Sequence, residues 1–231
     1  IYDFDRRYHP TGMPGLAAIR NPKSAIFRER ERLNGSIPMS YGLRTLDGHL
    51  GLYTDRWWAY DANISANRLG AMAVKYVVGE PPRDKQWFKK VADTPEPIYE
   101  NLRFGPRAYV AKEIVLPMNM DAEEFVPGST VMLEDVGELT GLPSVEFESA
   151  KVRFVVDDPD VVELEVEVVS NGQAEERFVL VLADTWFPGW EATVDGQDVP
   201  ILRANFFYTR AVLVPAGKHV VRFEYRPVSF Q

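Results

Sequence analysis

The sequence predicts an α+β protein in which a small mixed α/β part, residues 1–116, precedes an antiparallel β-sandwich of jelly-roll-like character, residues 117–231. Beyond about Pro117, short apolar runs with a two-residue period recur at regular spacing between turn signals, which is typical of an antiparallel sandwich. Charge divides the chain at nearly the same place: residues 1–115 hold 18 basic and 13 acidic residues, whereas residues 116–231 hold 8 and 21. The first part also places a helical segment before a β-branched run, an order typical of a mixed unit.

The clearest signal in the first part is a helix from Ser65 to about Ala73, followed by the strand Lys75–Val78, which Gly79 and two prolines terminate. The segments Pro97–Leu102 and Arg107–Val115 are expected to repeat this helix-then-strand order. Together these segments predict a small mixed α/β unit.

Two further segments of the first part are less sharply defined. A short helix is expected from Thr54 to Tyr60, where Trp57 and Trp58 would give it one strongly aromatic side. The segment from Asn21 to Gly35 fits a helix that Asn21 caps, but its apolar run followed by alternating charges also fits a short strand. Both interpretations remain open.

In the second part, alternation assigns an inward and an outward face to each expected strand. In Val161–Val169, apolar side chains alternate with glutamates, so this strand should be half buried with its acids outward. Phe178–Ala183 is apolar on both faces and is expected at the centre of a sheet. A strand beginning at His219 should direct Val221, Phe223 and Tyr225 into the core. The remaining expected strands are Lys151–Val156, Trp190–Val194 and the run that contains Val212 and Val214.

Turn signals separate these strands. Asp195-Gly196 is a strong two-residue hairpin signal, and Pro215-Ala216-Gly217-Lys218 marks another turn. Pro188 fixes its own φ and Gly189 can adopt a positive φ, so this pair should bend the chain sharply and direct the preceding aromatic side chains to one side.

Composition excludes several functional classes. The absence of cysteine excludes disulfides, thiolate metal sites and cysteine nucleophiles, and His9, His49 and His219 are too far apart for ligand spacing, so no metal site is predicted. The acidic second part argues against nucleic acid as a partner. No phosphate loop, nucleophile elbow or dinucleotide fingerprint occurs, and no cofactor is expected. The chain begins at Ile1 in charged sequence, so we expect it to be a segment of a longer protein.

Trp186, Trp190, Asn205 and His219 are candidate binding or structural residues. The two tryptophans flank the Pro-Gly turn, and a flat indole suits the C–H surface of a sugar. The alternating apolar row favours a core position for Trp190, and both interpretations remain open for Trp186. Asn205 would either bind a sugar hydroxyl or bond to neighbouring backbone, which is favoured. His219 is in phase with Val221, which predicts a buried, hydrogen-bonded residue at the start of a strand.

The charged candidates have competing interpretations as well. Arg107 would bind a phosphate bidentately or form a structural pair with an acid between the two parts, which is favoured. No spacing links the carboxylates of the first part into an acid–base pair. The acid-rich run 157–160 is expected to be a solvated turn rather than a calcium site, because it lacks the Gly-centred loop and distal Glu. The carboxylates considered are Asp47, Asp55, Asp61 and Asp84.

Several C-terminal motifs together resemble the end of YfhO-like bacterial polytopic membrane proteins. They are an aromatic-Pro-Gly-Trp turn, a Val-Asp-Gly hairpin, an Asn before an aromatic pair, a Val-Pro-Ala-Gly-x-His turn and a closing Tyr-x-Pro. In this chain they are Trp186–Trp190, Val194–Gly196, Asn205–Phe207, Val214–His219 and Tyr225–Pro227. Upstream, Tyr41–Gly48, Val74–Val78 and Gly105–Val110 also resemble segments of that family.

The resemblance implies a multi-spanning, glycosyltransferase-like parent protein that uses lipid-linked sugars and whose catalytic acid lies in an early loop outside this chain. The chain would then be a noncatalytic extracytoplasmic domain, tethered to the transmembrane portion of the parent and able to position a glycan or lipid-linked sugar. Two alternatives remain: a secreted carbohydrate-binding or adhesion module, and a soluble glycoside hydrolase, which needs convergent acids in a cleft.

Overall fold

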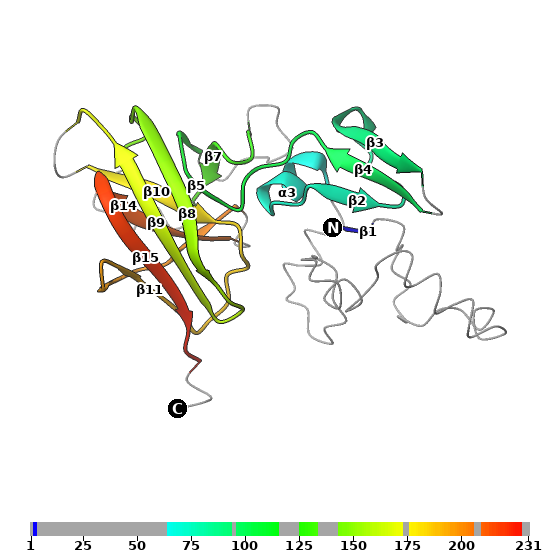
Figure 1. The fold of residues 1–231 in the computed structure, drawn as a ribbon. Helices are drawn as coiled ribbons and strands as arrows, with labels where there is room; N and C mark the ends of the chain where they lie inside the picture. Colours follow the sequence, from blue (N-terminus) through cyan, green and yellow to red (C-terminus); the bar gives the residue numbers. More distant parts are fainter. Residues whose placement is uncertain are drawn as a thin grey trace. The chain divides into compact units, whose positions relative to one another are not determined.

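The computed structural model describes residues 2–3, 64–93, 96–115, 125–133, 143–172, 176–205 and 209–227 of the 231-residue chain. The chain divides into two compact units, residues 1–70 with 74–104 and residues 71–73 with 105–231. Antiparallel β-sheet dominates the described part (Figure 1). The expected elements over Asn21–Gly35 and Thr54–Tyr60 lie outside the described residues.

The first unit combines a helix with a sheet whose described strands have the order β1-β2-β4-β3. The predicted helix and following strand are confirmed as α3 and β2, and β2 runs parallel to β1 and antiparallel to β4. The buried amide of Asn101 donates to the carbonyls of Ala66 and Val74, which ties the end of β4 to both ends of the helical segment. The elements are β1 (Tyr2–Asp3), α3 (Ala66–Ala71), β2 (Tyr76–Val78), the 3₁₀ turn η3 (Lys85–Trp87), β3 (Phe88–Asp93) and β4 (Pro97–Asn101).

The helix expected over Pro97–Leu102 was wrong, because Pro97–Asn101 forms β4. This strand pairs with β2 on one side and with β3 on the other, so its backbone groups are satisfied by ladder bonds. Ile98 and Tyr99 are β-branched and aromatic, residue types that suit a pleated sheet. Pro97 is tolerated because it occupies the first position of the strand.

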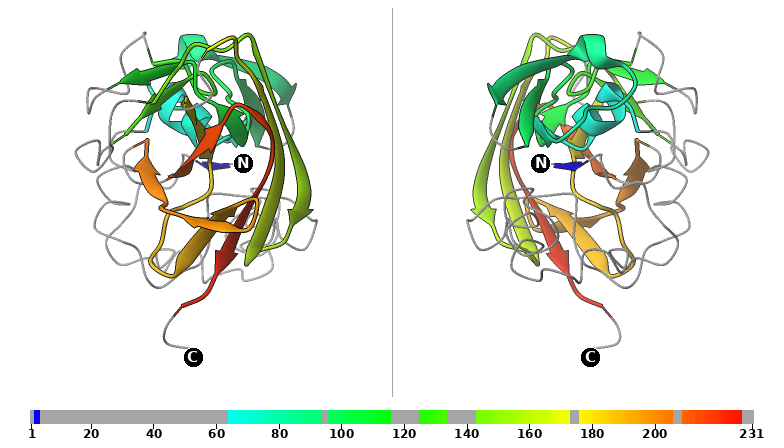
Figure 2. Two further views of the ribbon diagram at one scale, coloured as in Figure 1. Left: turned by 90° about the vertical axis from the view of Figure 1, so that its left-hand side faces the viewer. Right: turned by 90° about the vertical axis from the view of Figure 1, so that its right-hand side faces the viewer.

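The second unit is a β-sandwich of two antiparallel sheets. One has the strand order β12-β11-β15-β9-β8 and the other β13-β14-β10-β5. Its longest strands, β8, β9 and β15, run side by side (Figures 1 and 2). The strands of this unit are β5 (Ala108–Val110), β6 (Glu113–Val115), β7 (Thr130–Met132), β8 (Ser149–Asp157), β9 (Val161–Val169), β10 (Arg177–Leu182), β11 (Trp190–Val194), β12 (Gln197–Val199), β13 (Leu202–Ala204), β14 (Thr209–Pro215) and β15 (Gly217–Tyr225).

The main core lies between the inward rows of the two sheets. Val221 and Phe223 on β15 are fully buried as predicted, whereas Tyr225 at the end of that strand is half-buried. Phe178–Ala183 is buried on both faces, and its strand β10 lies between β14 and β5. Burying a side chain of this size contributes about 1.5–3 kcal/mol. The core therefore provides much of the stability of this unit. Its fully or nearly fully buried members are Val162, Leu164, Val166, Val168, Phe178, Leu180, Leu182, Ala192, Val212, Val214, Val221 and Phe223.

The segment Arg107–Val115, expected within residues 1–116, contributes β5 to the sandwich. Ala108–Val110 pairs antiparallel with β10, and the backbone N–H of Ala183 donates to the carbonyl of Arg107. The long segment of the second unit accordingly begins at Gly105. Pairing with the central strand β10 determines this placement, because the apolar side chains Tyr109 and Val110 are buried there.

The outer face of the five-stranded sheet carries cross-strand ion pairs. As predicted, the glutamates of β9 point outward, where Arg153 on β8 contacts Glu165 and Arg222 on β15 contacts Glu163. Such exposed pairs contribute little to stability but keep this face solvated. Within the described ranges, no helix combines the length and apolar character needed to cross a membrane.

Candidate functional site

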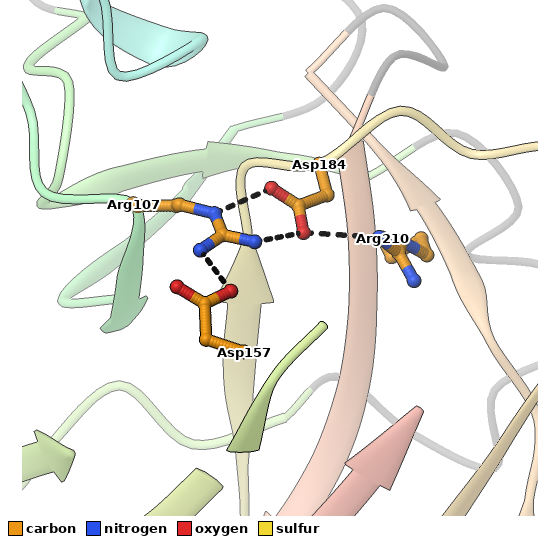
Figure 3. A network of polar contacts seen from close by, with 4 residues as sticks. All are labelled: Arg107, Asp157, Asp184 and Arg210. Atoms are coloured by element: carbon orange, nitrogen blue, oxygen red, sulfur yellow. Dashed lines mark hydrogen bonds and ion pairs between the residues drawn. The ribbon is translucent and has the colours of Figure 1, made fainter. Parts of the chain in front are cut away.

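Four charged side chains meet at one end of the sandwich (Figure 3). Leu182, the last residue of β10, pairs with the first residue of β5 on one side and with Arg210 of β14 on the other. Arg107 immediately precedes β5, Asp184 follows β10 by two residues, and Asp157 ends β8. The strand pairing therefore brings together residues from four separate segments. We call Arg107, Asp157, Asp184 and Arg210 the charged cluster.

Asp184 is the centre of the charged cluster. Its Oδ1 accepts from Nε of Arg107 at 2.6 Å, and its Oδ2 accepts from Nη2 of Arg107 at 2.6 Å and from Nη2 of Arg210 at 3.1 Å. The third nitrogen of Arg107, Nη1, donates to Oδ1 of Asp157 at 2.7 Å. The Arg107–Asp184 pair is thus bidentate, the strongest geometry for a guanidinium and a carboxylate.

Burial and the neighbouring negative charges act in opposite directions on the pKa of Arg107. Burial lowers the pKa of its guanidinium, but the hydrogen bonds and negative charges of Asp184 and then Asp157 outweigh burial and raise the pKa above its usual value. The guanidinium carbon also lies 4.8 Å from the ring centre of Phe154. Arg107 therefore forms a structural pair, but the pair does not join the two parts as expected, because Arg107 and both of its acids belong to the second unit.

Arg210 is a buried cation on an inward position of the sandwich. It lies in the same alternating row of β14 as Val212 and Val214, both core residues, and its side chain is only 3% exposed. Burial lowers the pKa of Arg210 to about 10, with Asp184 acting against this and Arg107 adding to it. The side chain therefore stays protonated at neutral pH, as arginine generally does.

Two aromatic rings lie close to the guanidinium of Arg210. Its central carbon lies 3.7 Å from the ring centre of Trp190 and 5.4 Å from that of Phe223. Its Nε and Nη1 are buried and have no hydrogen-bond partner among the described residues. The faces of the two rings, which carry partial negative charge, therefore complement the part of the cation that Asp184 does not reach.

The segment Asp184–Trp190, which we call the aromatic loop, links the two sheets. It runs from β10 in the four-stranded sheet to β11 in the five-stranded sheet, so the expected Pro188-Gly189 bend is a crossing between layers. Gly189 has φ of +102°, as its predicted role requires, and its carbonyl accepts from the N–H of Arg226 at 2.6 Å. A Cβ at Gly189 would lie 3.0 Å from the Cα of Pro227, so a side chain at this position would be crowded as well as strained.

The aromatic side chains of this loop differ in exposure. Phe187 is 49% exposed, whereas Trp186 is half-buried and has the guanidinium of Arg203 5.6 Å from its ring centre. Trp190 is partly buried against the main core, and its ring lies 5.3 Å from that of Tyr225. The most accessible aromatic face therefore belongs to Phe187, which the sequence analysis did not select.

Asn205 is a buried residue, 1% exposed, at the outer side of the four-stranded sheet. Its Oδ1 accepts from the N–H of Met132, and its Nδ2 donates to the hydroxyl of Tyr109, which in turn donates to the carbonyl of Thr130. It adopts φ of +51°, a left-handed conformation that Asn tolerates. The side chain thus holds β7 against the sheet, which agrees with the favoured interpretation that it bonds to neighbouring backbone.

His219 lies at the start of β15, as predicted, but it is half-buried rather than fully buried. Its Nδ1 lies 2.7 Å from Oδ2 of Asp195, and its Nε2 lies 3.1 Å from the carbonyl oxygen of Ala216. The other oxygen of Asp195 accepts from the N–H of Val220. These bonds, with those of His219, connect the Asp195-Gly196 hairpin to the turn around Gly217.

The hairpin and turn glycines have the expected backbone conformations. Asp195 and Gly196 adopt φ of +52° and +78°, which is the pattern of a type I′ hairpin turn, and they connect β11 to β12. Gly217 has φ of +114° and lies where the chain passes from β14 in one sheet to β15 in the other. These residues act in the connections between strands.

The remaining predicted acids do not converge within the described residues. Asp84 accepts from the backbone N–H of Ala66 at the start of α3. In the run 157–160, residues 158–160 form the predicted turn between β8 and β9, whereas Asp157 is still the last residue of β8 and pairs with Arg107. In the part of the chain that the structure describes, no three His, Asp or Glu side chains are grouped so as to hold a metal ion. The acids Asp47, Asp55 and Asp61, together with His9 and His49, lie outside the described residues.

The geometry of the charged cluster suits it to fixing structure. The carboxylate of Asp184 accepts three guanidinium N–H groups, and a carboxylate held in this way is ill placed to exchange a proton with a substrate. The aromatic loop, which Asp184 begins, is suited to contact an apolar or C–H-rich surface through Phe187.

The chain was compared with protein-family models, with curated proteins and with solved structures, and none of the three comparisons found a match.

Proposed function

We propose that this chain is a noncatalytic extracytoplasmic domain of a membrane-integrated, glycosyltransferase-like protein of the YfhO-like kind, and that its sandwich binds a glycan at the aromatic loop. The observation that carries the proposal is the exposure of Phe187 beside Trp186, on a loop whose first and last residues, Asp184 and Trp190, both contact the buried side chain of Arg210. A rigid, exposed aromatic face binds the C–H surface of a sugar at low entropic cost.

Several features favour binding over chemistry at this site. The arginines of the charged cluster occupy the oxygens of Asp184, the carboxylate that begins the aromatic loop. A glycoside hydrolase needs two carboxyl groups, one of which holds a proton for the leaving group. We therefore assign the catalytic step to the membrane portion of the parent, and to this chain the positioning of a glycan or a lipid-linked sugar.

The sequence motifs support the membrane attachment. The aromatic loop, the hairpin at Asp195-Gly196 and the turn at Gly217 are the places where the chain resembles the family, and each has a definite role in the sandwich. The mixed α/β first part and the jelly-roll-like sandwich would then each lie outside the membrane, with the transmembrane portion of the parent as their partner.

Glycan binding is tested with the 231-residue chain on an array of bacterial envelope saccharides, followed by calorimetry with the best saccharide. Phe187→Ala should weaken binding at least tenfold. Val220→Ala is the matched control, because Val220 is also exposed, at 42%, but lies on the outer face of β15. Failure of the unchanged chain to bind any saccharide, or equal binding by Phe187→Ala, would overturn the proposal.

Location is tested separately in cells that express the full reading frame. The chain contains no cysteine, and Lys218 has a side chain that is 81% exposed, so Lys218→Cys introduces one accessible thiol. A membrane-impermeant maleimide should label this thiol in intact spheroplasts, and the labelled protein should sediment with membranes. Release of the labelled protein into the medium would favour the secreted binding module, and labelling only after lysis would exclude an extracytoplasmic location.

A further inference from the structure

A single buried arginine contacts both ends of the aromatic loop. At the start of the loop, Nη2 of Arg210 donates to Asp184 at 3.1 Å, and at its end the guanidinium lies 3.7 Å from the ring centre of Trp190. We infer that Arg210 is the positioning residue that fixes the aromatic loop and thereby presents Trp186 and Phe187. The ligand side of this inference rests on the proposed function, whereas the positioning itself does not.

The location of Arg210 indicates a specific role. The same inward row of β14 continues with Val212 and Val214, and an apolar residue would fit that pattern. Burial of a charge is costly and is tolerated only where the charge is paired. Asp184 and the two aromatic rings supply this pairing from residues outside the strand, and two of those partners, Asp184 and Trp190, delimit the loop.

The planar shape of the guanidinium allows both contacts at once. Its edge can donate to a carboxylate while its face lies over a ring, whereas the ammonium of lysine is a compact point charge that cannot do both. The Nε and Nη1 atoms of Arg210, which have no hydrogen-bond partner among the described residues, agree with a group held by stacking. A lysine at this position should therefore keep the charge but release one end of the loop.

Arg107 has a different role at the same carboxylate. It holds Asp184 with two hydrogen bonds and contacts Asp157 and Phe154, and among the described residues it forms no such contact with Trp190. Loss of Arg107 should therefore release only the start of the loop. Loss of Arg210 should release both ends, and this difference separates a positioning role from general stabilisation.

The test measures amide hydrogen exchange in the unliganded chain. In Arg210→Lys and Arg210→Met, exchange should rise at least tenfold at Trp190 and Arg226, whose N–H groups donate to the loop carbonyls of Phe187 and Gly189, while the core amides of β9 keep their protection. Arg222→Met is the matched control, because Arg222 also contacts two acids but lies on the outer face, where its side chain is 38% exposed. Unchanged loop exchange in a folded Arg210→Lys protein would overturn the inference.

A second pair of variants keeps the test decisive if both Arg210 variants fail to fold. Asp184→Asn and Trp190→Leu remove one contact each, the anion and the ring. The first should raise exchange at Ala183, whose N–H bonds beside the start of the loop, and the second at Arg226, whose N–H bonds at its end. If amide exchange at both ends of the loop were the same in both variants as in the unchanged chain, the inference would also be overturned. Where a binding saccharide is found, Arg210→Lys should lose affinity for it at least tenfold. If no saccharide binds, the proposed function fails while the exchange results still decide the role of Arg210.

Discussion

Arg107 and Asp184 are separated by 77 residues in the sequence and are joined by two parallel hydrogen bonds of 2.6 Å. The pair ties the start of β5 to the chain that leaves β10, and it lies at the edge of the core, where each side chain is 19% exposed. The pairing of β5 with β10 brings the two side chains together, and both belong to the second unit.

Asp184→Ala should be strongly destabilising, because it leaves Arg107 and Arg210 without their shared anion. Removing one partner of a buried pair costs about 3–5 kcal/mol, and we expect about 3 kcal/mol because the pair is partly exposed. Urea denaturation measures this free energy. A double-mutant cycle with Arg107→Ala should show coupling of at least 1 kcal/mol, on the order expected for a contacting charged pair. A loss of stability close to zero for Asp184→Ala would contradict the importance of the cluster.

Gly189→Ala should cost more than Gly196→Ala, although both glycines have positive φ. At Gly196, with φ of +78°, no atom lies within 4 Å of an added Cβ, so only the left-handed backbone is penalised, by about 1 kcal/mol. At Gly189 the added Cβ would also meet Pro227 and Tyr225 at 3.0 Å, and overpacking of this kind costs a further 1–3 kcal/mol or so. Equal thermal midpoints for the two variants would show that the loop adjusts to the added methyl group without a further loss of stability.

Alternation alone predicted much of the sandwich. The expected strand ranges in Val161–Val169, Phe178–Ala183 and Trp190–Val194 agree with β9, β10 and β11, and the buried faces agree too, because a two-residue period allows only one face to enter the core. Short segments were less predictable. Pro97–Asn101 became a strand because β2 and β3 pair with it, and such pairing is a tertiary effect that local sequence does not contain.

The candidate site was predicted only in part. Trp186, Asn205 and Arg107 were selected as single residues, but Asp184, Phe187 and Arg210 were not. A signal for Arg210 exists in the sequence, since a charged residue occupies the inward phase that Val212 and Val214 continue. Its partner could not be found in this way, because Asp184 reaches Arg210 only through the pairing of β10 with β14.

The pairing of Asp195 with His219 should make the free energy of unfolding depend on pH in the acidic range. The hydrogen bond from His219, and next the backbone N–H of Val220, lower the pKa of Asp195 below its ordinary value. The lowered folded-state pKa stabilises the protein fully above the unfolded value of about 3.9, and this contribution is lost as the pH falls through the folded value. The effect should be small, because the Asp195 side chain is about half exposed, at 52%.

Asp195→Asn provides the test of this pH dependence. The free energy of unfolding of the unchanged chain, minus that of the variant, should be larger at pH 6 than at pH 3. Asn also suits the positive φ of this position, which is +52° in the unchanged chain, but that gain is independent of pH and cancels in the comparison. A difference that is constant between the two pH values would contradict the assigned pairing.

Trp190→Ala and Phe187→Ala should separate the structural part of the aromatic loop from its binding part. Trp190 packs against the main core and against Arg210, so its removal should cost about 3 kcal/mol, the lower end of the range for a large aromatic residue because the ring is only partly buried. Phe187 is 49% exposed, so alanine there should change stability by less than about 0.5 kcal/mol, as is usual for surface positions. Thermal denaturation and saccharide affinity, measured on both variants, give the comparison. A Trp190→Ala protein as stable as the unchanged chain would mean that the Trp190 ring does not belong to the core. A Phe187→Ala protein with lower stability but unchanged affinity would assign that ring to packing.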